Sequence, residues 1–187
     1  MNTSQSKVSK GGLVIAAIVV IVAIKGIAFA IRPSVKASDL RPYTDTAGAF
    51  SAKFPGTPKL IERPTAIPGV SFKMHAVEIG DTVLAVAYFD LPEDRTLEGN
   101  EQAGLTAELQ AFAKSLKAKP KGATRKFELQ EMQAQEARFE APGVGELIVR
   151  LAIREDRRLY RVVYMSKSFD EAVGRAFVDS FVMDGEL

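Results

Sequence analysis

Alternating apolar and polar positions in the first half of the chain predict β-strands. Apolar side chains recur at every second position of residues 50–54 and 70–76, which is the period of a strand with one buried face. Residues 82–91 are apolar on both faces, so we expect a central strand that is covered from both sides. A turn at Gly80-Asp81 would join these last two strands as a hairpin. The short apolar segment at residues 60–61 lies between prolines, which favours an edge strand or an irregular crossing.

Two later segments have the period of an amphipathic helix. The first has one apolar stripe made of Leu105, Leu109, Phe112 and Leu116. We place Glu108 among its polar positions, Asn100 at its N-cap, and its end in residues 119–122. The second begins with a capping box at residues 168–171. Its apolar positions fall four residues apart, at Phe169, Val173, Phe177 and Phe181.

Strands fill the space between the two predicted helices. Residues 127–129 and 137–139 alternate over short stretches, and residues 147–153 and 159–165 form a hairpin around a turn at 154–157. About seven strands and two helices in this order predict an α+β fold, with an antiparallel sheet packed against the helices.

A different pattern occupies the N-terminus. Residues 12–31 are predominantly apolar over 20 positions, enough to span a bilayer of about 30 Å as a helix. Lys25 opposes insertion by about 3 kcal/mol, but the surrounding apolar side chains outweigh that cost. We therefore predict a transmembrane signal anchor at 12–31 after a tail at 1–11. A cleavable signal peptide is the alternative, with a small-x-small site at Ala28-Phe29-Ala30.

Both alternatives export the rest of the chain. We predict a linker at 32–48, which has two prolines and no hydrophobic period, and a single domain at 49–187. Basic residues flank the apolar segment on both sides, at Lys7 and Lys10 before it and at Arg32 and Lys36 after it, so charge bias does not decide the orientation. The short tail and long C-terminal part favour a single-pass protein of the cell membrane whose domain lies outside the cytoplasm.

Composition narrows the functions that this domain can have. Four of the 25 Lys and Arg residues precede Pro33, whereas all 23 Asp and Glu residues follow it, so the exported part carries a slight negative charge. That balance argues against nucleic-acid binding, which needs a clustered positive surface. The chain has no cysteine, which excludes disulfides, thiolate nucleophiles and cysteine-ligated metals.

Several short motifs together suggest a family resemblance. They are Phe50-Ser-Ala-Lys-Phe-Pro-Gly56, Tyr88-Phe89, Arg138-Phe139, Tyr160-Arg-Val-Val163 and the closing helix Ala176-Phe-Val-Asp-Ser-Phe181. In this order, residues 49–183 resemble the PsbP-like α/β sandwich superfamily, and most of all its bacterial envelope members. The resemblance implies an antiparallel sheet between helices and a non-catalytic binding or assembly role. The resemblance assigns no functional residue to this chain, because the matched positions are core and cap positions.

The sequence contains no catalytic or metal-binding set. His75 is the only histidine, and we expect it on the wetter face of its strand. One histidine without cysteine does not form the sites that zinc prefers, and no G-x-S-x-G motif marks a serine nucleophile. Gly143-Val144-Gly145 lacks a third glycine and a following helix, so we interpret it as a turn. We therefore expect no enzyme activity, metal or cofactor.

Arginines around the predicted 147–165 hairpin are the best candidate for a binding surface. Strand alternation and the turn would bring several guanidinium groups together. Such groups bind carboxylates and phosphates through paired hydrogen bonds. The candidate residues are Arg150, Arg154, Arg157, Arg158 and Arg161. The alternative is a solvated face neutralised by Glu146, Glu155 and Asp156.

We accordingly expect a membrane-tethered binding or assembly module of the bacterial envelope, whose partner is an envelope protein or an anionic ligand. One rival is a small-ligand carrier or enzyme with a pocket between sheet and helix, lined by Tyr88, Tyr160 or Tyr164. Another is a secreted protein of the same fold, and a third is a purely structural envelope protein.

Overall fold

The structure is a computed structural model that describes residues 34–65, 68–92, 97, 99–154 and 157–183. The predicted tail at 1–11 and the predicted membrane span at 12–31 lie outside these residues. No helix within the described ranges is long and apolar enough to cross a membrane.

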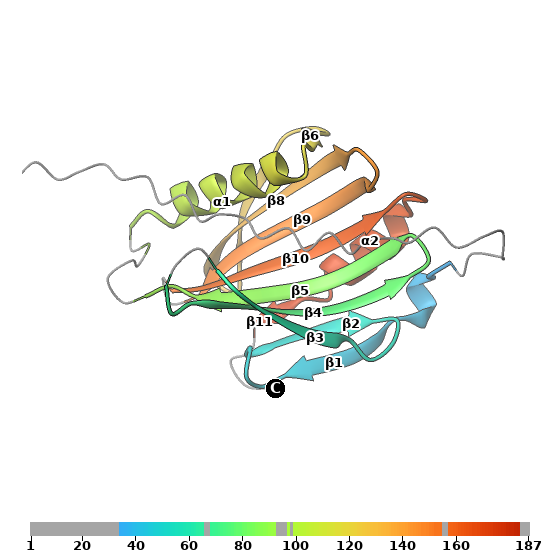
Figure 1. The fold of residues 1–187 in the computed structure, drawn as a ribbon, viewed down its shortest axis with the longest axis horizontal. Coiled ribbons are helices and arrows are strands. Elements are labelled where there is room, and N and C mark those ends of the chain that lie inside the picture. The colour runs from blue at the N-terminus through green and yellow to red at the C-terminus, as the bar shows by residue number, and fades with distance from the viewer. Residues whose placement is uncertain (1–33, 66–67, 93–96, 98, 155–156, 184–187) are drawn as a thin grey trace, which may run out of the picture.

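An eight-stranded antiparallel sheet, the large sheet, forms the centre of the molecule (Figure 1). Its strands follow the order β3-β4-β5-β10-β9-β8-β6, and β7 pairs with β8 beside that path. Their bounds are β3 Lys59–Pro64, β4 Ser71–Ile79, β5 Thr82–Asp90, β6 Lys119–Pro120, β7 Arg125–Leu129, β8 Met132–Ala141, β9 Gly145–Arg154 and β10 Arg158–Ser166. The predicted 80–81 and 154–157 hairpins are confirmed as β4–β5 and β9–β10. Strand β5 is buried at every position except its last, as expected of a central strand.

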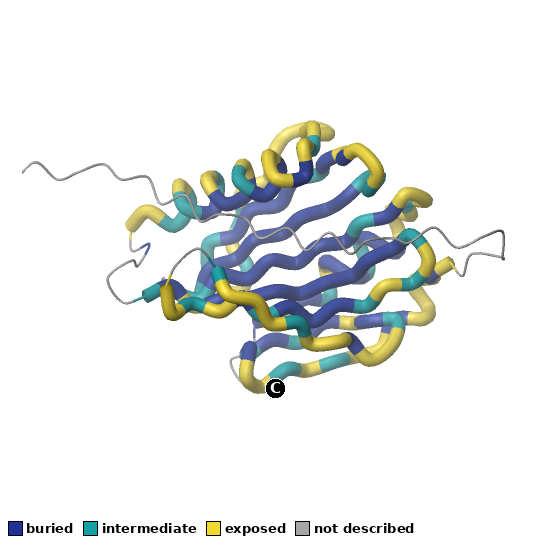
Figure 2. The backbone as a smooth tube through the Cα atoms, in the orientation of Figure 1, coloured by how far each residue is buried: buried dark blue, intermediate teal, exposed yellow. Residues whose placement is uncertain are grey.

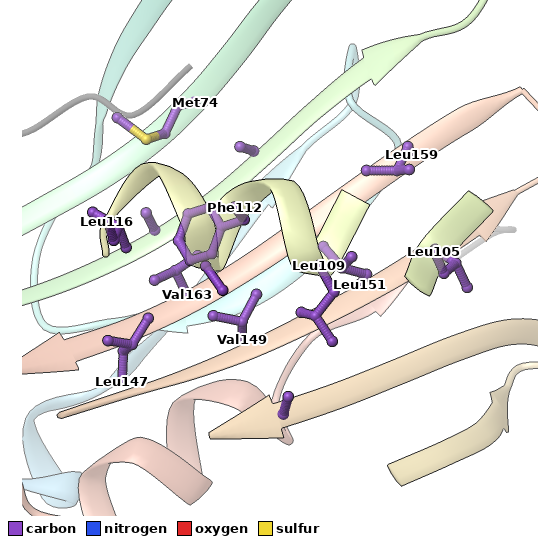
Figure 3. Packing of buried hydrophobic residues seen from close by; sticks show 14 of the residues in the cluster. Met74, Leu105, Leu109, Phe112, Leu116, Leu147, Val149, Leu151, Leu159 and Val163 are labelled. Atoms are coloured by element: carbon purple, nitrogen blue, oxygen red, sulfur yellow. The ribbon is translucent and has the colours of Figure 1, made fainter. Parts of the chain in front are cut away.

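Helix α1 (Glu101–Ser115) covers one face of the large sheet, over β8 and β9. Figure 3 shows its apolar side chains between those of the sheet, and the four residues of the predicted stripe are all buried. Glu108 is buried as well, so its placement among the polar positions was wrong. Asn100 occupies the N-cap position, but its side chain makes no capping hydrogen bond.

The opposite face carries a second layer, made of helix α2 (Glu171–Val178) and a small sheet with the order β1-β2-β11. The small-sheet strands are β1 Arg41–Asp45, β2 Phe50–Phe54 and β11 Val182–Met183. The sequence predicted one sheet, whereas β2 belongs to this separate one. Asp170 caps α2, because its Oδ1 accepts hydrogen bonds from Ala172 N (2.8 Å) and Val173 N (3.1 Å). The predicted cap, Ser168, lies two residues earlier.

Part of the predicted linker at 32–48 is folded, so the domain begins earlier than residue 49. A short 3₁₀ helix, η1 (Ala37–Asp39), and β1 both fall within it, and Val35 and Leu40 are buried. Strand β1 is the edge of the small sheet, where Pro42 is tolerated because one side of the strand makes no sheet hydrogen bonds. The proline and the exposed outer face hid the strand period from sequence reasoning.

The two layers bury the large sheet from both sides. In Figure 2 the central strands are buried along most of their length, while β3 and the turns are exposed. Separate apolar clusters fill the space on each face, so a strand residue belongs to the α1 side or to the α2 side according to its alternation. This alternation decides where the candidate arginines lie.

Candidate functional site

The strand register separates the five candidate arginines into three groups. Arg154 lies directly opposite Arg158, next to the β9–β10 turn that contains Arg157. Arg150 lies opposite Val162, on the same face as Arg154, but deeper in the sheet. Arg161 directly precedes Val162 in β10, so its side chain points to the other face of the sheet. The structure thus brings three of the five arginines together.

Arg154, Arg157 and Arg158 line an open pocket of about 420 Å³ together with Ala49 and Asp90, and we call this the arginine depression. The guanidinium of Arg158 donates two hydrogen bonds to Asp90, from Nε to Oδ1 (2.5 Å) and from Nη2 to Oδ2 (2.7 Å). These bonds lower the pKa of Asp90 and raise the pKa of Arg158. The guanidinium group of Arg158 is therefore held in place by the carboxylate of Asp90.

Backbone contacts hold the same turn against its neighbours. Arg158 Nη1 donates to the carbonyl of Ala47 (3.1 Å), and its guanidinium lies 5.3 Å from the centre of the Tyr88 ring. Arg157 Nε donates to the carbonyl of Leu91 (3.2 Å), whose own amide donates to Arg157 O (2.9 Å). These contacts fix the positions of Arg157 and Arg158 in the depression. Guanidinium groups bind planar anions such as carboxylates through paired hydrogen bonds.

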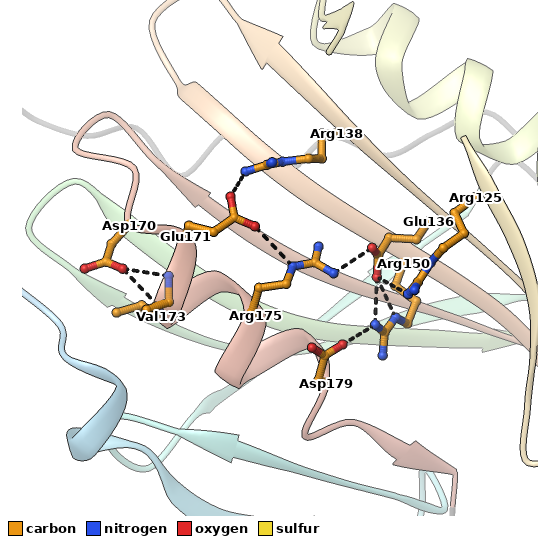
Figure 4. A network of polar contacts seen from close by, with 10 residues as sticks. Arg125, Glu136, Arg138, Arg150, Asp170, Glu171, Val173, Arg175 and Asp179 are labelled. Atoms are coloured by element: carbon orange, nitrogen blue, oxygen red, sulfur yellow. Dashed lines mark hydrogen bonds and ion pairs between the residues drawn. The ribbon is translucent and has the colours of Figure 1, made fainter. Parts of the chain in front are cut away.

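Arg150 belongs to a buried ion network between the large sheet and α2 (Figure 4). Its Nε and Nη2 donate to Glu136 Oε2 (2.9 and 2.7 Å), and Nη2 also reaches Asp179 Oδ1 (2.5 Å). Its Nη1 donates to the carbonyl of Val178 (2.8 Å) at the end of α2, and Arg175 donates to the other oxygen of Glu136 (2.8 Å). With 4% of its side chain exposed, Arg150 fastens α2 to the sheet.

Arg161 forms a second buried ion pair, between β10 and α1. Its Nη2 donates to Glu108 Oε1, and the rings of Phe72 and Phe112 lie 5.7 and 4.8 Å from its guanidinium carbon. Burial lowers the pKa of Arg161. Arg150 and Arg161 are thus placed in the interior, away from the arginine depression.

His75 is buried between β4 and the small sheet, so its expected position on a wetter face was wrong. Its Nδ1 is hydrogen-bonded to the hydroxyl of Tyr43 (3.0 Å), and its Nε2 lies 3.4 Å from Asp45 Oδ2. The Tyr88 ring is stacked on it at 13°. Burial lowers the pKa of His75, although the nearby Asp45 carboxylate acts in the opposite direction. Across the described residues, no three metal-ligating side chains gather as a metal site would require.

The tyrosines suggested for a ligand pocket lie in the apolar cluster on the α2 side. The hydroxyl of Tyr160 donates to the carbonyl of Gly48 (2.8 Å), and that of Tyr164 accepts from the amide of Asp170 (3.1 Å). Burial, with a smaller contribution from Asp45, raises the pKa of Tyr88 to about 12. These side chains join layers of the fold.

Sequence reasoning missed a second open pocket, also of about 420 Å³. Lys117, Lys119 and Lys167 line it, together with Glu140 and the β8–β9 turn, and we call it the lysine depression. The signal available in the sequence was the run of lysines around the end of α1. The distant Lys167 joins them only through the fold.

The comparisons with known proteins agree with this architecture. The solution structure of cyanobacterial PsbP (CyanoP) from Synechocystis sp. PCC 6803 is similar, with a TM-score of 0.54 over 78% of this chain and 92% of that one. The two sequences are 14% identical, so the similarity concerns the fold alone. No family model matches the sequence, and no curated protein matches it. The chain therefore has a PsbP-like fold.

Proposed function

We propose that this chain is a membrane-tethered, extracytoplasmic and non-catalytic binding module of the bacterial envelope, which holds an anionic group of a partner protein in its arginine depression. The observation that carries the proposal is the convergence of Arg154, Arg157 and Arg158 on one open surface. Among the described residues that line this surface, Asp90 is the acidic one, and Arg158 already binds it. A partner carboxylate would meet a positive surface whose geometry is fixed before binding, which reduces the ordering cost of association.

The membrane tether rests on the apolar segment at 12–31, which has the length and composition of a bilayer span. Washing membranes with alkaline carbonate tests it, because an integral chain stays in the pellet. N-terminal sequencing of the mature chain distinguishes the retained anchor from cleavage after Ala30. Release by carbonate, or a mature chain that begins at Ile31, would contradict the tether.

Binding is tested by crosslinking in native membranes followed by purification of the full chain. We expect Arg154→Ala/Arg157→Ala to reduce partner recovery at least about tenfold, because truncating one side of a buried, hydrogen-bonded charge pair costs about 2–5 kcal/mol. Arg63→Ala is the matched control, since Arg63 is an exposed arginine of β3. Equal recovery from both variants, with unchanged thermal melting, would reject the arginine depression as the binding surface.

A further inference from the structure

The lysine depression lies at the end of the large sheet opposite to the arginine depression. Paired residues run across this end, one strand after another, in the row Ile79, Thr82, Ser166, Glu146, Glu140 and Lys119. The other end of β5 is Asp90, which is paired with Arg158. Eight residue steps along β5 separate the two ends, or about 27 Å at about 3.4 Å per residue.

Lysines from three separate segments meet in the lysine depression. Lys117 follows α1, Lys119 lies in β6, and Lys167 lies between β10 and α2. All three are exposed and form no ion pair with other described residues, whereas the neighbouring Lys121 pairs with Glu146 (2.7 Å). Glu140 is the one acidic residue among those that line the pocket. Among the described residues that line it, three lysines outnumber one glutamate, so this surface carries a net positive charge.

The described chain begins at the same end of the molecule. In Figure 1, the first described residues and η1 lie at the right, as do the β4–β5 and β8–β9 turns. Only Arg32 and Pro33 stand between Ile31, the last residue of the predicted span, and Ser34, the first described residue. The three residue steps from Ile31 to Ser34 reach at most about 11 Å. A tether this short keeps the lysine end of the domain within reach of the lipid headgroups.

We propose that the lysine depression docks on the anionic surface of the bilayer, with its ammonium groups on the phosphates of acidic lipids. The inference rests on the membrane tether proposed above. The Debye length is about 8 Å at physiological ionic strength, so ammonium groups that contact the headgroups are not fully screened. The bilayer is favoured over a soluble anion because the tether keeps it permanently within reach. Docking also directs the arginine depression away from the membrane, toward an envelope partner.

The experiment uses the full chain in lipid nanodiscs, with and without phosphatidylglycerol. Because the chain has no cysteine, Pro142→Cys carries one fluorophore beside the lysine depression, and Ala47→Cys carries one at the arginine end. Nitroxide-labelled headgroups then report which end contacts lipid. We expect quenching at position 142 only when phosphatidylglycerol is present, and none at position 47. About 1 M NaCl should abolish it, because the Debye length falls to about 3 Å.

Charge removal gives the matched comparison. Each lysine near an anionic surface changes the ratio of docked to undocked domain about fivefold. The double variant Lys117→Gln/Lys167→Gln should therefore lower this ratio about 25-fold. Arg63→Gln/Lys126→Gln removes the same charge from exposed positions elsewhere and should leave quenching unchanged. Quenching that needs no acidic lipid, or that survives in the lysine variant, would overturn this inference alone. A chain that carbonate strips from the bilayer would overturn the tether as well.

Discussion

The two faces of the large sheet each bury one arginine, and they satisfy it differently. On the α2 side, Arg150 binds Glu136, Asp179 and the carbonyl of Val178. On the α1 side, Arg161 binds Glu108, but Arg161 Nε and Glu108 Oε2 have no hydrogen-bond partner among the described residues. An unsatisfied buried polar group costs about 1–3 kcal/mol. Every side-chain nitrogen of Arg150 therefore has a hydrogen-bond partner, whereas Arg161 belongs to a pair that leaves one atom on each side without one.

The largest effect should come from removing one member of the pair that Arg161 forms with Glu108. We expect Arg161→Ala to lower the free energy of unfolding by about 3–5 kcal/mol, because Glu108 is left as a buried charge without a counterion. Urea denaturation measures the change. The exposed Arg63→Ala should stay within about 0.5 kcal/mol of the parent chain. A loss of the same small size for Arg161→Ala would show that Glu108 is already neutral.

Replacing both members of each ion pair tests the difference between the two faces of the sheet. Glu108→Leu/Arg161→Met should restore the stability of the parent chain or exceed it by about 1–4 kcal/mol, as well-packed apolar residues do in place of a buried pair. Glu136→Leu/Arg150→Met should remain destabilised by roughly 2 kcal/mol or more, because Arg175 and the carbonyl of Val178 lose their partners. Similar urea midpoints for the two double variants would contradict the difference between the faces.

The burial of Arg161 and Glu108 can be predicted in part from the sequence. The period of two in residues 147–165 predicts the β9–β10 hairpin, and both strands are apolar enough to be buried, so a charge inside them needs a partner. Glu108 follows Leu105 by three residues, which places it on the apolar stripe of α1. The pairing itself was not predictable, because Glu108 and Arg161 are 53 residues apart and meet only when α1 packs on the sheet.

Strand alternation and the hairpin turn predicted that several of the five arginines converge, and the register explains why three of them meet. Val162, rather than Arg161, lies opposite Arg150, so Arg161 points to the other face. The hairpin turn brings Arg154 and Arg158 together because it pairs the ends of two adjacent strands. Local period could therefore predict the arginine depression, whereas burial of the other two depended on layers that the sequence does not place.

His75 extends the comparison to a basic group that can lose its charge. It lies in the cross-strand row that runs through Val86 and Val162 to Arg150, so it shares the face on which Arg150 is buried. Burial lowers its pKa below the ordinary value of 6.5, which means that the folded chain prefers neutral His75. Arg150, by contrast, is bound to the carboxylates of Glu136 and Asp179.

The smallest effect follows from that preference. As the pH falls below about 6.5, the unfolded chain takes up a proton at His75 before the folded chain does, so the free energy of unfolding decreases toward acid. His75→Gln should flatten this slope in urea titrations between about pH 5 and 7, because Gln does not titrate. Asp45→Asn should steepen it, since the carboxylate that favours protonated His75 is removed. Stability that rises toward acid in the parent chain, or an Asp45→Asn slope no steeper than the parent's, would show that Asp45 outweighs burial. His75 would then act as a charged partner, like Arg150 on the same face.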